Sequence, residues 1–169
     1  VYDGGTGGLL RDLYGIDDPN FRGGARTAVG DLNGDGTPDL AVAAGAGGGP
    51  RVAVFDGRTV LTDRLGKLVG DFYAFEDGLR NGAFVAIADL DGDGFGDLIC
   101  GAGPGGAPRV LGFSGRQLLT GQQSVLFDLY AGGQEERGGV RIAAIDVDQN
   151  GRPDVVAGTG PNGGGAVRI

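Results

Sequence analysis

Three short segments of this chain carry oxygen-bearing side chains at the same spacing. They begin at Asp31, Asp89 and Asp146 and read DLNGDGTPD, DLDGDGFGD and DVDQNGRPD. Each has Asp or Asn at positions one, three and five, glycine at position six and Asp at position nine. Calcium takes six to eight oxygen ligands, and a tight loop with alternating carboxylates turns such ligands toward one point. The spacing therefore predicts one calcium loop in each segment.

The residue at position seven of each loop varies freely in type, being Thr37, Phe95 or Arg152. Such variation is expected of a residue that binds a cation through its backbone carbonyl, while glycine at position six permits the sharp turn. The predicted calcium ligands are Asp31, Asn33, Asp35, the Thr37 carbonyl and Asp39 in the first loop; Asp89, Asp91, Asp93, the Phe95 carbonyl and Asp97 in the second; and Asp146, Asp148, Asn150, the Arg152 carbonyl and Asp154 in the third.

The number of acids ranks the three loops and narrows the choice of cation. The second loop has four acids and the others three each, so on charge alone it should bind calcium most tightly. Magnesium fits less well, because it requires near-octahedral geometry and sheds water reluctantly. Polar turns without a metal are the alternative, but crowded carboxylates repel one another when no cation is present. An EF-hand is excluded, since position twelve is Val42, Cys100 or Ala157 instead of Glu.

The loops belong to a repeat of 58 and then 57 residues, and the segments around them are also similar. In the middle repeat, short apolar runs predict strands near Val69–Phe75, Phe84–Ala88, Asp97–Gly101 and Arg109–Phe113. Four strands joined by turns make one antiparallel sheet, and sheets repeated radially are the blades of a β-propeller. We therefore expect an all-β fold of three four-stranded blades. A solenoid is the competing layout, although its repeats are usually shorter.

Residues 1–169 are expected to form a single repeat domain, with repeats at approximately 1–53, 54–111 and 112–169. The last residues, AVRI, followed by the first, VYDG, reproduce PRVAVFDG of the first repeat. The repeat boundary thus falls within a strand that the two termini would share. Propellers have about four to eight blades, so three blades are too few to close a ring. Either two copies associate into a six-bladed ring, or the sequence is part of a longer array.

Composition limits the possible partners and activities. A net charge of −8 disfavours nucleic acid, and no apolar run approaches the roughly 20 residues of a membrane span. Histidine is absent, which removes the commonest general base. No group of potential catalytic residues breaks the symmetry of the repeat, so we expect no enzyme activity. Cys100 is the only cysteine and lies in an apolar run, as a small buried hydrophobic residue would.

The run VGDLNGDGTPDLAVAAGAGGGP and its echoes IADLDGDGFGDLICGAGPGGAP and AIDVDQNGRPDVVAGTGPNGGG resemble FG-GAP repeats of the integrin α-subunit propeller. They are also similar to VCBS-type repeats of bacterial surface and secreted proteins. The resemblance covers essentially the whole chain and implies a β-propeller with calcium in the loop between the first two strands of each blade. It departs from the pattern at Asn150, which replaces an acid, and at Ala166 and Val167, which replace Pro-Arg.

The same resemblance implies a non-catalytic adhesion or ligand-binding role, with the protein secreted or on a bacterial cell surface. The ligand would be a protein or a glycan. A lectin-like propeller, with sugars bound in clefts between blades, is one alternative. A propeller hydrolase or lyase that uses Asp and Glu is another, because such chemistry does not require histidine.

Overall fold

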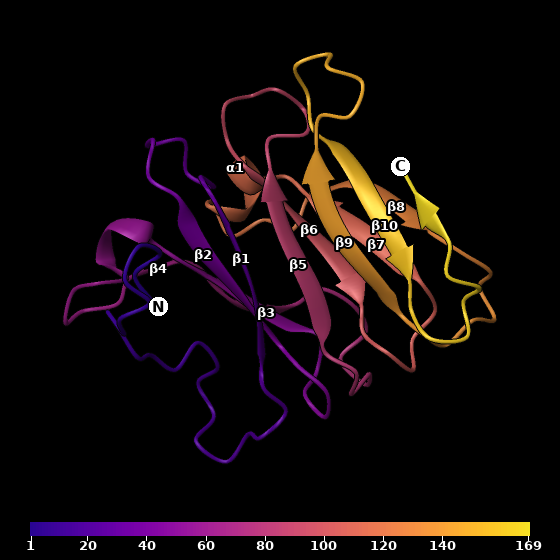
Figure 1. The fold of residues 1–169 in the computed structure, drawn as a ribbon, viewed down its shortest axis with the longest axis horizontal. Coiled ribbons are helices and arrows are strands. Elements are labelled where there is room, and N and C mark those ends of the chain that lie inside the picture. The colour runs from indigo at the N-terminus through magenta and orange to yellow at the C-terminus, as the bar shows by residue number, and fades with distance from the viewer.

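A computed structural model describes residues 1–169 and contains three antiparallel sheets, which we call blades (Figure 1). The first blade has β1 (Ala25–Gly30), β2 (Asp39–Ala44), β3 (Arg51–Phe55) and β4 (Lys67–Tyr73). The second has β5 (Ala83–Ala88), β6 (Asp97–Ala102), β7 (Arg109–Phe113) and β8 (Val125–Tyr130). The third has β9 (Val140–Ile145), β10 (Asp154–Thr159) and β11 (Val167–Arg168).

The predicted all-β architecture of small antiparallel sheets is confirmed, but the predicted grouping of strands was wrong by one strand. The segment Val69–Phe75 was assigned to the middle blade, whereas β4 pairs with β3 through contacts such as Val52 with Phe72. The reason is the hairpin between β3 and β4, which is closed by a hydrogen bond from Asp56 N to Gly66 O at 2.9 Å. The connection from β4 to β5 instead crosses to the next blade.

Helical structure is confined to two turns that follow the third strand of a blade. They are η1 (Gly57–Thr59) after β3 and α1 (Gly115–Leu118) after β7. Each is capped by the side chain of the residue before it: Asp56 accepts from Arg58 N at 2.9 Å and Ser114 from Gln117 N at 3.4 Å. No helix has the length and apolar character needed to cross a membrane.

The first strands of the three blades lie next to one another, with β5 between β1 and β9 (Figure 1). Neighbouring blades approach closely at these strands. A Cβ atom on Gly30 of β1 would lie 2.7 Å from the Cβ atom of Ile87 in β5, so only glycine fits there without a shift. The arrangement is that of consecutive propeller blades in an open row, with the two termini at opposite ends of the row.

The core lies between the faces of neighbouring blades, and alternate residues of one strand serve different interfaces. In β6, Leu98 and Cys100 pack against the first blade, while Ile99 packs toward the third. This strand is buried on both faces, which explains the apolar run that follows Asp97. Cys100 is a buried hydrophobic residue, as predicted, and burial raises the pKa of its thiol.

The outer face of the first blade is covered by the segment that precedes β1. There, Ile16 packs against the cluster around Val42 and Phe55. Residues 1–10 form a hairpin of their own, in which Tyr2 forms a β-bridge with Leu9. We call this segment the N-terminal hairpin. The side chain of Asp3 accepts hydrogen bonds inside it, as the caps of the two helical turns do. The N-terminal hairpin therefore resembles the connection between the third and fourth strands of a blade.

Candidate metal centre

Each of the three aspartate-rich loops connects the first strand of a blade to the second. The last residue of the first strand pairs with Asp at position nine: Gly30 with Asp39, Ala88 with Asp97 and Ile145 with Asp154. Because this pairing folds the chain back on itself, positions one and nine stand at the same end of the hairpin. The strand register thus brings the two outermost acids of each loop together.

The three loops share one pattern of internal hydrogen bonds. The carboxylate at position one accepts from the N–H groups of positions five and six at 2.7–3.1 Å. The side chain at position five accepts from the N–H of position seven at 2.8–2.9 Å. Position six has φ between +82° and +88°, a left-handed conformation that favours glycine. These bonds orient the side chains before any ion is considered, so the loops are built alike.

The acid at position nine also links its loop to the turn after the third strand. Asp39 and Asp97 are completely buried. Asp39 accepts from Leu32 N and Gly57 N, both at 2.9 Å. Asp97 accepts from Leu90 N at 2.9 Å and from Gly115 N at 3.0 Å. Burial raises the pKa of both carboxyl groups, an effect that the backbone N–H donors oppose.

Carboxylate oxygens converge in the second and third loops. One oxygen from each of three acids lies within 4.8 Å of the others, the acids being those at positions one, three and nine. The two sets are Asp89, Asp91 and Asp97, and Asp146, Asp148 and Asp154. In the first loop, position three is Asn33, whose amide oxygen could serve as the corresponding metal ligand. Oxygen donors alone suit a hard cation, so these residues fit calcium.

Asp93 is not part of the converging set of the second loop, and the side chains at position five of all three loops contact other groups. The carboxylate of Asp35 pairs with Arg58 and that of Asp93 with Arg116. In the third loop, the amide of Asn150 donates to Asp148 at 3.0 Å. We did not anticipate the two arginines from the sequence. The available signal was the recurrence of Gly-Arg one residue after the third strand in both repeats.

The first two loops lie in direct contact along the same side of the blades. Gly96 N of the second loop donates to Asp31 O of the first at 2.8 Å. A Cβ atom on Gly34 would lie 2.7 Å from the carbonyl oxygen of Gly94. The guanidinium of Arg152, in the third loop, approaches the second loop at Gly92. The three candidate sites are therefore neighbours in space.

Comparison with known families supports the repeat assignment. Residues 31–100 match the sequence model of the FG-GAP-like repeat. The matched segment runs from the first residue of the first loop, through β2–β5, to Cys100 in β6. It thus includes the whole of the first two loops.

Proposed function

We propose that each of the three repeats binds one calcium ion, a proposal supported by the match of residues 31–100 to the FG-GAP-like repeat model. The observation that carries the proposal is the convergence of three carboxylate oxygens within 4.8 Å in the second and third loops. The shared hydrogen-bond pattern extends the proposal to the first loop. The proposed ligands are the side chains at positions one, three, five and nine and the carbonyl at position seven, with the acid at position five of the first two loops shared with an arginine.

Calcium acts structurally in this proposal. When bound, it supplies the positive charge that offsets repulsion among the converging acids. The protein side chains fix the loop that joins the first two strands, and through position nine they also fix the turn after the third strand. Calcium would therefore stabilise the blades together with their loops.

We further propose a non-catalytic binding or adhesion role for the chain outside the cytoplasm, in a secreted or surface-exposed bacterial protein. Extracellular modules bind calcium with a Kd of about 10⁻⁴–10⁻³ M, so such sites fill only where calcium is abundant. The acidic side chains of the three loops recur at equivalent positions of each repeat, and none of these clusters contains a nucleophile beside a base. This uniformity favours a scaffold that presents a surface to a protein or glycan.

Calorimetric titration should detect three calcium ions per chain. The matched control replaces the position-one acids together, as Asp31→Asn, Asp89→Asn and Asp146→Asn, which keeps the size of the side chains and removes one negative charge from each loop. We expect this variant to lose at least tenfold in affinity at each site. Absence of calcium uptake by the wild-type chain at 10 mM calcium would rule out the proposal.

A second copy of the chain is the proposed partner of the open third blade. This blade has three strands where the others have four, and Val167 and Ile169 at its edge are 67% and 72% exposed. The N-terminal hairpin resembles the element that would complete it. Two chains arranged head to tail would complete the third blades and give six blades, within the usual range of about four to eight.

Light scattering should then give a mass close to twice 16.9 kDa in calcium. We expect Tyr2→Asp and Val167→Asp to shift the equilibrium to single chains, because each places a charge at the proposed contact. Thr62→Asp, on the exposed turn after η1, is the matched control and should leave the mass unchanged. A wild-type mass of 16.9 kDa at all concentrations would refute the dimer and favour a longer array of repeats.

A further inference from the structure

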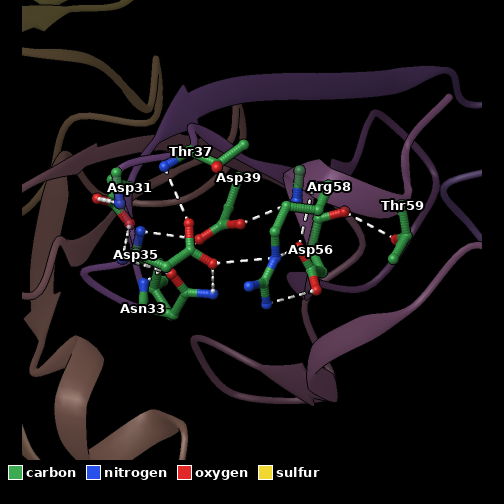
Figure 2. A network of polar contacts seen from close by, with 11 residues as sticks. Asp31, Asn33, Asp35, Thr37, Asp39, Asp56, Arg58 and Thr59 are labelled. Atoms are coloured by element: carbon green, nitrogen blue, oxygen red, sulfur yellow. Dashed lines mark hydrogen bonds and ion pairs between the residues drawn. The ribbon is translucent and has the colours of Figure 1, made fainter.

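Two arginines occupy equivalent places beside the first and second loops. Arg58 lies in η1 and Arg116 in α1, each one residue after the glycine that donates to the position-nine acid. Nε of Arg58 lies 3.2 Å from Oδ2 of Asp35, and Nε of Arg116 lies 2.9 Å from Oδ2 of Asp93. The same two atoms meet in both repeats, at the same loop position. Figure 2 shows Arg58 between Asp35 and Asp56.

Additional contacts hold each guanidinium in place. Arg116 also donates to the backbone carbonyl of Asp93 at 3.3 Å, and its Cζ atom lies 4.4 Å from the centre of the Phe95 ring. Arg116 thus contacts positions five and seven of the second loop. Arg58 instead shares its charge between Asp35 and Asp56, reaching the latter through Nε and Nη2 at 3.2 Å each. The two arginines are fixed by different neighbours but reach the same carboxylate position.

The third loop provides a natural comparison. Its position five is Asn150, which carries no charge, and no arginine side chain pairs with it. Asn150 instead bonds within the loop, to Asp148 and to the N–H of Arg152. A guanidinium from the turn after the third strand therefore pairs with the position-five acid in the first two loops, whereas the only arginine at the third loop, Arg152, contacts position five through its backbone N–H.

We propose that Arg58 and Arg116 set the calcium affinity of the first two loops, an inference that rests on the proposed calcium-binding function. The carboxylate at position five has two possible partners, the guanidinium and the cation. A positive charge a few ångströms from a divalent cation weakens its binding. The guanidinium also holds the carboxylate on the side of the helical turn. Both arginine side chains are more than half exposed, so solvent screens the effect and keeps it moderate.

This pairing changes the affinity ranking that the count of acids suggests. The second loop has four acids, but Arg116 offsets one of them. The third loop has three acids and no paired arginine. Arg152 of the third loop also extends its guanidinium toward Gly92 of the second loop, so a second positive charge lies close to that loop. The second loop should lose its predicted advantage over the third, and it should regain this advantage when Arg116 is neutralised.

The test is to titrate the Arg58→Gln and Arg116→Gln variants with calcium and to monitor binding at each step by NMR. The amides of Gly36, Gly94 and Gly151, at position six of the three loops, report on each site separately. We expect calcium to bind about threefold to tenfold more tightly at the first loop of Arg58→Gln and at the second loop of Arg116→Gln. The difference in calcium affinity between each variant and the wild-type chain should shrink at 1 M salt, because salt screens the charge of the arginine. The Gly151 signal is the internal control and should not change.

Arg64→Gln is the matched external control, since it removes the same charge from an exposed side chain that pairs with no loop acid. It should leave all three affinities unchanged. Unaltered or weaker calcium binding at the second loop of Arg116→Gln would overturn the role proposed for the arginines. A wild-type chain whose three glycine amides do not respond to calcium would instead reject the proposed function. Thermal unfolding in chelator establishes that each variant is folded.

Discussion

Excess EGTA should lower the melting temperature of this chain by about 8–16 °C relative to a solution with calcium tenfold above its Kd. At that concentration each occupied site adds about 1.4 kcal/mol to the free energy of unfolding, and three sites add about 4 kcal/mol. Domains of this size gain about 2–4 °C per kcal/mol. The change is large because net domain stability is only about 5–15 kcal/mol. Differential scanning calorimetry measures it directly.

The triple position-one variant described above is the control for this melting experiment. Its melting temperature should depend only weakly on calcium, because each loop has lost one acid from its ligand set. Magnesium at the same concentration should restore less stability than calcium, because it tolerates a narrower geometry. Identical melting curves of the wild-type chain in calcium and in EGTA would contradict a structural role for the ion.

Asp97→Ala should lower the free energy of unfolding by about 2–6 kcal/mol, even in EGTA. The carboxylate of Asp97 is the acceptor for Leu90 N and Gly115 N. Alanine leaves these two donors without an acceptor in a buried place, and each such loss costs about 1–3 kcal/mol. Chemical denaturation in EGTA isolates this contribution from any effect of calcium.

Asp91→Ala in the same loop is the matched comparison. The side chain of Asp91 is exposed and accepts one hydrogen bond, from Asp93 N at 3.1 Å. We expect Asp91→Ala to change the free energy of unfolding by less than about 1 kcal/mol in EGTA and by more in calcium. If Asp97→Ala proved as stable as the wild-type chain in EGTA, the position-nine acid would have no structural role apart from metal binding.

Much of the local structure could be predicted from the sequence, because it depends on neighbouring residues. Short apolar runs located β5, β6 and β7 to within a residue or so. The Asp, Asn and Gly spacing located the three turns, since glycine at position six adopts the left-handed conformation that the turn requires. Both signals are contained within about ten residues of chain, which is the range over which such patterns carry information.

Contacts between distant segments could not be predicted in the same way. The pairing of β4 with β3 instead of with the following strands depends on which connection closes as a hairpin, and both connections contain turn residues. The burial of Asp97 depends on Gly115, which is 18 residues away. Arg116 reaches Asp93 from 23 residues along the chain. Loop spacing alone identified the acids as ligands and could not show that two of them serve other partners.

The chain passes from the fourth strand of one blade to the first strand of the next. This regular path has a consequence for how the number of repeats can evolve. Equivalent residues of successive repeats are separated by nearly constant lengths of 58 and 57 residues. Recombination between any two equivalent points would remove or add one such length. The product would keep whole blades and one acidic loop per blade, wherever the exchange occurred. An array of this kind can therefore grow or shrink by gene duplication without passing through a broken fold.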